Sequence, residues 1–333
     1  RRQRQMCIRD RKDMKSILFY TGLLAGTFWA CGGGGNEEPT PEPPIPSVEK
    51  IEMKVAVSGI QAWGEMGEKF EDGQNIGLFA VNRENAGTKA RLTSASGNQV
   101  NNVKNTLQSD GKTWKAASTM YWKDANTVVD AYAYYPWVST PSGAEVTRWP
   151  VTVKSDQTKE EDGKASDFLW AHSSGQKAGS DGVLSLAFQH LLSKIILNIK
   201  IEDAIKDVYT INGVKFTALQ TTATCDLNTG DVTALQENKS EMIPYDKTPD
   251  KQNLELIVIP QHIVAAKFLK VEVNIGEGVI RTFEYNLSED LQGERGKLYT
   301  LEVTVEKESE PLKPIDVKIS DWVSGGNQDV ETD

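Results

Sequence analysis

The chain is 333 residues long, with 38% hydrophobic residues, 25% charged residues and a formal net charge of −10. Its first thirty residues hold seven Lys/Arg and two Asp/Glu, so the chain from Cys31 onward has a net charge of −15. This acidity excludes a nucleic-acid-binding protein, which needs a basic surface, and argues against electrostatic adhesion to an anionic membrane.

The N-terminal region is typical of a bacterial lipoprotein precursor. Residues 1–13 are basic and polar without periodicity, and we assign them to upstream translation because Met14-Lys15 is a better start. Residues 14–30 are predicted to be a lipoprotein signal peptide, with an apolar run that is shorter than the roughly 20 residues of a transmembrane helix. Cys31 follows directly, and we predict that it is lipidated. Plain secretion and a retained anchor are the alternatives.

Residues 31–47 form a predicted tether, CGGGGNEEPTPEPPIPS. Its glycines make the first part flexible, and its prolines stiffen the second part into an extended segment. The acidic pair Glu37-Glu38 fits a solvated linker.

From Val48 the chain shows the alternation of half-buried β-strands. A first strand is predicted from the apolar residues that alternate with polar ones in the segment after Val48: Ile51, Met53, Val55 and Val57. Further strands are expected at 76–81, 128–135, 183–188, 195–201, 254–259, 271–275, 279–285 and 299–305, and a turn at 203–208.

A last strand is predicted after Pro311 and Pro314, where three apolar residues alternate with polar ones: Ile315, Val317 and Ile319. Many short strands separated by Gly, Asp and Asn turns predict an all-β sandwich or barrel.

Two domains are predicted from a composition break. The stretch 173–182 (SSGQKAGSDG) is polar and glycine-rich, and six of the seven tryptophans after Cys31 precede it. Since domains run to roughly 100–200 residues, we predict an N-terminal domain at 48–180 and a C-terminal domain at 181–333.

Motifs for catalysis or metal binding are missing from the sequence. His172, His190 and His262 form no H-E-x-x-H pair, and the chain has no C-x-x-C and no G-x-S-x-G. Cys225 has no partner for an intramolecular disulfide, and its sequence neighbours include no His to activate it, so we expect a buried apolar role. We therefore predict no metal, no cofactor and no enzymatic activity.

Seven segments form a pattern by their order along the chain. They are Trp63-Gly64, 72–80 (DGQNIGLFA), 130–136 (DAYAYYP), 167–171 (DFLWA), 188–195 (FQHLLSKI), 257–261 (IVIPQ) and 319–322 (ISDW). In this order the chain resembles the fimbrillin family of Bacteroides-type bacteria, the subunits and accessory proteins of surface pili.

The resemblance implies two transthyretin-like β-sandwich domains and export as an outer-membrane, cell-surface lipoprotein anchored through Cys31. It implies a structural subunit, anchor or tip of a fimbria that supports adhesion, with other fimbrial subunits as partners. It also gives Glu37-Glu38 a second interpretation, as an acidic signal for transport to the cell surface.

In the family, a protease removes the lipidated segment with the first strand, and a strand from a neighbouring subunit fills the groove. Carried onto this chain, the removed strand is about 49–58, and the donated strand has Ile315, Val317 and Ile319 as its pocket-filling side chains. Alternation alone fits equally well with two ordinary strands that complete their own sandwich.

The expected processing site departs from the family pattern. The best-known members are cut after an Arg, whereas the first Arg after Cys31 is Arg83, and the first strand contains only Lys50 and Lys54 as basic residues. Either another protease acts here, or this subunit keeps its strand and serves as an anchor or tip.

A surface glycan-binding lipoprotein is the alternative function. Its expected mark is an exposed, coplanar pair among four tryptophans that stacks on sugar rings: Trp114, Trp122, Trp137 and Trp149. Burial in a core is the commoner fate of tryptophan.

Overall fold

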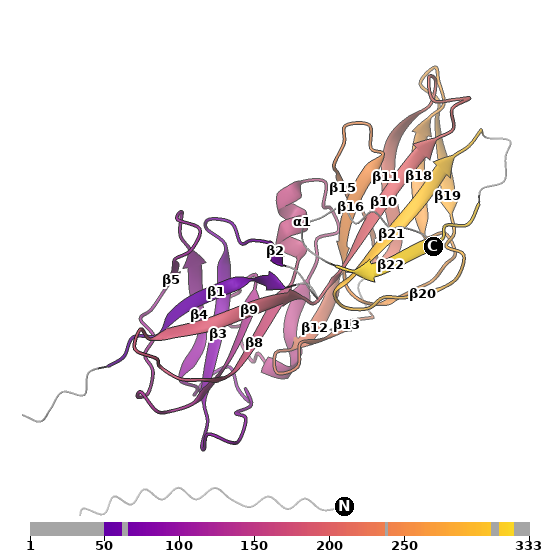
Figure 1. Ribbon diagram of the computed structural model, residues 1–333. Helices are drawn as coiled ribbons and strands as arrows, with labels where there is room; N and C mark the ends of the chain where they lie inside the picture. The colour runs from indigo at the N-terminus through magenta and orange to yellow at the C-terminus, as the bar shows by residue number, and fades with distance from the viewer. Residues whose placement is uncertain (1–49, 62–65, 237–238, 308–312, 323–333) are drawn as a thin grey trace, which may run out of the picture. The chain divides into compact units, whose positions relative to one another are not determined.

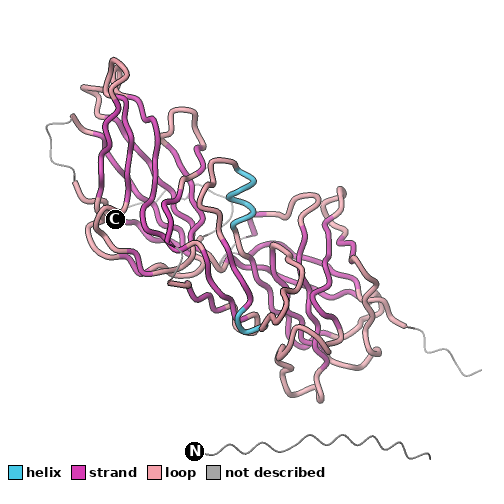
Figure 2. The backbone as a smooth tube through the Cα atoms, turned by 180° about the vertical axis from the view of Figure 1, so that it is seen from behind, coloured by secondary structure: helices cyan, strands magenta, loops and turns pink. Residues whose placement is uncertain are grey.

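The structure is a computed structural model, and it describes residues 50–61, 66–236, 239–307 and 313–322. All of these lie in one compact unit, Glu49–Asp333. The predicted signal peptide, the predicted lipidation site Cys31 and the predicted tether lie outside the described residues. The described chain is almost entirely strand and loop, which confirms the all-β, sandwich-like fold (Figures 1 and 2).

The N-terminal half forms an eight-stranded sheet in the order β2-β1-β9-β8-β6-β3-β4-β5 (Figure 1). The strands are β1 Lys54–Gln61, β2 Met66–Glu68, β3 Asn75–Asn82, β4 Val100–Leu107, β5 Trp114–Ala116, β6 Val129–Tyr135, β8 Leu169–Gln176 and β9 Val183–His190. The sheet curls back on itself: Met53 N–H donates to the Met120 carbonyl at 2.8 Å, which joins the segment before β1 to the segment after β5.

The C-terminal half has two larger sheets, in the orders β15-β16-β10-β21-β22 and β14-β11-β18-β19. Strands of the first are β10 Ser193–Ile201, β15 Tyr245–Asp246, β16 Asn253–Val258, β21 Lys297–Val305 and β22 Val317–Asp321. Strands of the second are β11 Thr210–Gln220, β14 Lys239–Met242, β18 Leu269–Asn274 and β19 Ile280–Tyr285. Buried residues alternate along β10 and β18, and both strands contribute to one apolar cluster, as sandwiched sheets do.

A connecting region joins the halves. It holds the 3-10 helix η1 Val146–Arg148, the strand β7 Trp149–Thr152 and the helix α1 Glu160–Ser166. Strand β7 forms a three-stranded sheet with segments from the C-terminal half, in the order β13-β12-β7, and a small pair β17-β20 completes the fold. These last strands are β12 Thr222–Asp226, β13 Asp231–Ala234, β17 His262–Ile263 and β20 Leu291–Gln292.

Strands β3 and β6 separate two cores because both of their faces are buried. In β6, Ala131 and Ala133 face the core inside the eight-stranded sheet. The intervening Tyr132 and Tyr134 belong to the second core, which continues into the C-terminal sandwich. The run DAYAYYP therefore alternates between the cores: Ala131, Ala133 and Tyr135 enter the first, and Tyr132 and Tyr134 enter the second.

The predicted domain boundary at residue 180 precedes β9, which still belongs to the eight-stranded sheet. The chain changes sheet at Leu191 and Leu192, between β9 and β10, and both residues are buried. The limits of the two domains therefore stay a prediction. The second core continues from the N-terminal half into the C-terminal half, across Leu191 and Leu192.

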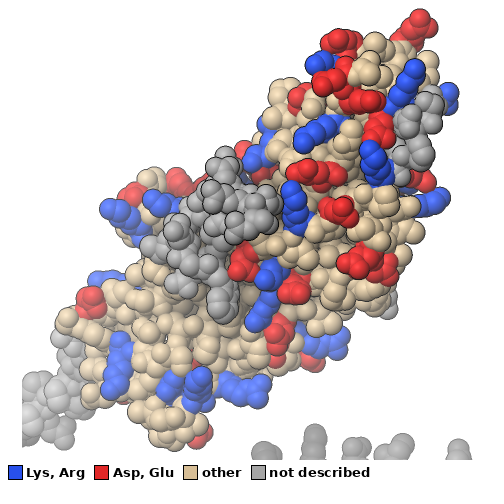
Figure 3. Space-filling view, turned by 45° about the vertical axis from the view of Figure 1, so that its right-hand side comes forward, with Lys and Arg blue, Asp and Glu red and all other residues tan. Residues whose placement is uncertain are grey.

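Charged side chains of both signs are interspersed on the face shown in Figure 3. The described residues also include ion pairs at the surface, such as Lys270 with Glu241 at 2.9 Å. Exposed pairs contribute about 0–1 kcal/mol each, so the two apolar cores dominate the stability of the fold.

Candidate functional site

The first-strand candidates lie partly inside the N-terminal core. Met53 and Val55 are buried, Ile51 and Val57 are half-buried, and β1 begins only at Lys54. β1 lies between β2 and β9, with Val55 opposite Leu184 and Val57 opposite Leu186 in the parallel ladder with β9. This strand therefore contributes both backbone hydrogen bonds and apolar side chains to the sheet.

Gly182 lets the start of β1 lie close to the turn before β9. Its φ is +69°, and its carbonyl accepts hydrogen bonds from Lys54 N–H at 3.0 Å and from the Trp122 indole at 2.9 Å. A Cβ at this position would overlap the carbonyl oxygen of Glu52. Only glycine satisfies both the backbone conformation and the close approach.

The three last-strand candidates differ in how far their side chains are buried. Ile315 is 1% exposed, Val317 is half-buried, and Ile319 is 56% exposed. Ile319 is directly opposite Tyr299 in the antiparallel β21–β22 ladder, so the two side chains share a sheet face, yet Tyr299 is buried. The edge strand β22 thus leaves one apolar residue of that face largely uncovered.

The two sets of candidates lie in different parts of the molecule. Met53 and Val55 belong to the core inside the eight-stranded sheet, whereas Ile315 belongs to the core of the C-terminal half. Within one subunit, the last strand therefore does not occupy the position beside β9.

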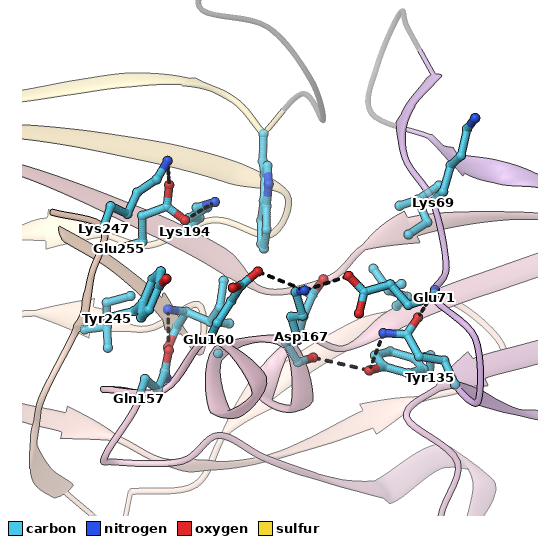
Figure 4. Close-up of a pocket in the computed structure, with 18 residues that line it drawn as sticks. Lys69, Glu71, Tyr135, Gln157, Glu160, Asp167, Lys194, Tyr245, Lys247 and Glu255 are labelled. Atoms are coloured by element: carbon cyan, nitrogen blue, oxygen red, sulfur yellow. Dashed lines mark hydrogen bonds and ion pairs between the residues drawn. The ribbon is translucent and has the colours of Figure 1, made fainter. Parts of the chain in front are cut away.

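A cleft of about 530 Å³ lies where β1, helix α1, β10 and β16 meet (Figure 4). In Figure 4, Lys194, Lys247 and Glu255 lie at one side of it, and Lys69 and Glu71 lie at the other. Glu255 pairs with both Lys194 and Lys247, at 2.6 and 2.7 Å. Burial acts to raise the pKa of Glu255, but these two lysines outweigh burial and lower it.

Lys164 of α1 is the central cation of this cleft. Its Nζ lies 2.9 Å from Glu160 and 2.6 Å from Glu71, so it links the helix to the segment that precedes β3. The hydrogen bond to Glu160, and then that to Glu71, raise the pKa of Lys164. The cleft therefore joins elements by ion pairs.

Trp322 lines the same cleft and was missed as a functional residue at the sequence level. Its indole stacks on the His190 ring with centroids 3.8 Å apart and an interplanar angle of 16°. His190 Nδ1 lies 2.9 Å from Asp167 Oδ2. All three residues belong to the segments FQHLLSKI, DFLWA and ISDW, but no sequence signal indicated that these segments meet.

The remaining chemistry-bearing residues have structural surroundings. His172 stacks on Tyr132 at 4.6 Å, and burial lowers its pKa. Burial raises the pKa of Cys225 to about 12, so its thiol is not an activated nucleophile. Among the described residues, no group of three His, Cys, Asp or Glu is placed to hold a metal.

The four tryptophans named for glycan stacking do not form an exposed pair. Trp114, Trp122 and Trp149 are buried. Trp137 is half-buried, its indole N–H donates to the Asn102 carbonyl, and Lys104 lies over its ring at 5.2 Å. The expected mark of a glycan-binding protein is therefore missing from these positions.

Arg83, the first arginine after Cys31, is held in a buried ion pair. Its guanidinium donates to both Asp130 oxygens, at 2.7 and 3.0 Å, and also to Ser174 Oγ. Asp130 is fully buried and accepts two further hydrogen bonds, from the N–H groups of Ala90 and Gly175. A protease cannot reach Arg83 without unfolding this network.

Among the described residues, the helices are too short and too polar to cross a membrane. This finding concerns only the chain from residue 50 onward, with its gaps.

Residues 64–322 match the model of the fimbrillin-like family. No curated protein sequence matches the chain significantly.

Several crystal structures share the fold. A provisionally assigned cell adhesion protein from Bacteroides uniformis has 20% identity and a TM-score of 0.59, over 84% of this chain and 100% of that chain. A similarly assigned protein from Bacteroides ovatus has 17% identity and a TM-score of 0.59, over the same shares. A fimbrial protein from Bacteroides vulgatus has 16% identity and a TM-score of 0.54, over 82% and 99%.

Proposed function

Because this chain belongs to the fimbrillin-like family, we propose that it is a structural subunit or an anchor or tip protein of a cell-surface fimbria that supports adhesion. The fold shared with fimbrial and cell adhesion proteins supports this function. Its place of action is the cell surface, and the precursor is attached to the outer membrane through a lipid on Cys31.

The position of β1 carries the proposal of assembly by strand donation. Loss of β1 would leave β9 with one unpaired edge, and it would open the core where Met53, Val55 and Ile60 are buried. An open edge beside vacated apolar pockets recruits an extended strand through backbone hydrogen bonds and alternate side chains.

The C-terminal strand fits such a groove by its spacing. Ile315, Val317 and Ile319 repeat the interval of Met53, Val55 and Val57, so three alternate side chains can enter three adjacent positions. Because donor and acceptor lie in different parts of one subunit, the exchange takes place between subunits.

Processing, where it occurs, uses a basic residue other than Arg83. Lys69 is exposed and follows β2, and it is the one Lys or Arg between β1 and β3. Phe70, the next residue, is anchored by edge contacts to Trp114 and Phe188, each with centroids 5.2 Å apart. A cut between Lys69 and Phe70 would free β1 and β2 and leave the new end fixed.

Mass spectrometry of the protein from native surface fractions tests the role. A mature N-terminus at Phe70 within SDS-resistant ladders is the result expected of a stalk subunit. A lipidated Cys31 in a protein that is found only at the base or tip of fimbriae indicates the anchor or tip role. A lipidated Cys31 without any association with fimbriae would contradict the proposed function.

A further inference from the structure

The C-terminal segment is fastened to its own subunit at its two ends. At one end, Ile315 N–H donates to the Asn286 carbonyl at 2.8 Å, and its carbonyl accepts from Ser288 N–H at 3.0 Å. At the other end, Trp322 N–H donates to the Gly296 carbonyl at 2.8 Å, and its side chain is 5% exposed. Between these ends, Ile319 is mostly exposed, so the two ends contribute most of the side-chain burial.

The contact at Trp322 is the more elaborate of the two. The indole lies nearly parallel to the His190 ring, and Lys194 Nζ lies 5.8 Å from the indole centroid. Asp167 Oδ2 lies 2.9 Å from His190 Nδ1, and Asp167 is itself the C-cap of α1, where its N–H donates to the Gly163 carbonyl. Three separate elements therefore position one aromatic pair: α1, β9 and β10.

The stack lies at a point that strand donation has to disrupt. A strand that enters a neighbouring subunit must first leave β21 and withdraw Trp322 from His190. His190 is the last residue of β9, and β9 is the strand beside which the incoming donor would pair. Strand β9 thus holds the subunit's own C-terminal strand through His190, and its edge would pair with the donor strand of a neighbouring subunit.

We propose that the stacked rings of Trp322 and His190 form a latch that keeps the C-terminal strand on its own subunit and limits how fast it becomes available to a partner. The partner is a second copy or another fimbrial subunit, so this inference rests on the proposed function. It leads to a specific expectation: replacement of the Trp322 side chain by a smaller one should speed the release of the C-terminal strand.

The latch is tested in the full chain by hydrogen exchange of the amides of β22. Trp322→Ala is expected to raise their exchange by about tenfold or more, because local opening loses the buried indole contact. Ser320→Ala is the matched control in the same strand, and it should leave exchange within about twofold because its side chain is already exposed. Equal exchange in Trp322→Ala and in the unaltered protein would overturn the latch.

His190 variants separate the ring stack from a general loss of structure. His190→Phe keeps a flat ring against Trp322 and should retain most of the protection of β22, whereas His190→Ala should lose it. Far-UV circular dichroism and the urea midpoint identify any variant that has unfolded globally. If both His190 variants stay folded and show equally fast hydrogen exchange in β22, the ring stack does not hold the C-terminal strand in place.

A displacement assay then separates the latch from the proposed function. A labelled peptide of residues 313–322 is added to the full chain, and its rate of binding should rise in Trp322→Ala but not in Ser320→Ala. If exchange rises but no variant polymerises or exchanges strands with another subunit, the latch holds and strand donation fails. If polymers form at the same rate with and without Trp322→Ala, the latch does not limit assembly.

Discussion

At the scale of single residues, Arg83 and Asp130 form a buried ion pair. The Arg83 side chain is 9% exposed and the Asp130 side chain 0% exposed, and the pair makes further hydrogen bonds with the loop after β3 and with β8. In the sequence, Arg83 was notable only as the first arginine after Cys31, which bears on proteolytic processing. Its pairing could not be predicted, because Asp130 lies inside a strand pattern whose aromatic residues give no sign of a charge partner.

Removal of one member of this pair should be costly. Arg83→Met is expected to lower the free energy of unfolding by about 3–5 kcal/mol, since it leaves the Asp130 charge buried without a partner. Arg148→Met, at an exposed position, is the matched control and should change it by less than about 0.5 kcal/mol. Urea denaturation checks both, and equal midpoints for the two variants would contradict the assignment.

The same pair predicts a dependence on pH. Burial acts to raise the pKa of Asp130, but the hydrogen bonds from Arg83, Ala90 and Gly175 outweigh burial, so its pKa in the folded state is lowered. A lowered pKa in the folded state stabilises the fold. This stabilisation is fully present when the pH is above the pKa of an aspartate in the unfolded chain, and it is lost as the pH falls through the pKa in the folded state. The unfolding free energy should therefore fall below about pH 4, and Arg83→Met with Asp130→Asn should flatten that part of the curve. An unchanged acid slope in the double variant would count against Asp130 as its source.

At the scale of elements, alternation predicted the strands that face one core and missed those with irregular patterns. Strands β10, β18, β19 and β21 lie where periodicity placed them. Strand β4 was missed because VNNVKNTL is polar and includes Asn102 with φ +45°. Helix α1 was missed because its seven residues, EEDGKAS, have no apolar face.

The docking of β1 can be tested through Gly182. Gly182→Ala is expected to destabilise the fold by more than about 2 kcal/mol, because its Cβ meets backbone at a positive φ. Gly143 has a similar φ, +71°, but a Cβ added there would have no atom within 4 Å, so Gly143→Ala should cost about 1 kcal/mol. Hydrogen exchange of β1 localises the effect, and a loss of stability without faster exchange in β1 would place it elsewhere.

At the scale of the whole molecule, the two halves share a core. Trp149 of β7 has edge contacts with Phe79 and Tyr134 of the N-terminal half, at 5.7 and 5.3 Å, and it is opposite Cys225 of β12 in the shared sheet. The sequence indicated two unlike halves from the tryptophan distribution. It could not show that they are joined, because a shared core depends on which faces of β3 and β6 are covered.

This sharing predicts joint unfolding. The chain should show one cooperative transition by tryptophan fluorescence and by circular dichroism, and Trp149→Ala should lower its unfolding free energy by about 3–5 kcal/mol. Fragments cut between β9 and β10 should fail to fold alone, since each exposes part of the shared core. Two separate transitions, each retained in one fragment, would contradict a shared core.

The parallel pairing of β1 with β9 also has a consequence for the order of folding. Ser58 of β1 bonds to Leu186 of β9 across 128 positions in the chain, so the strand made first meets its partner only after most of the N-terminal half exists. Closing so long a loop is entropically costly, and contacts of high sequence separation form late. During folding, the edge of β9 therefore stays open until β1 reaches it, and the eight-stranded sheet is completed late.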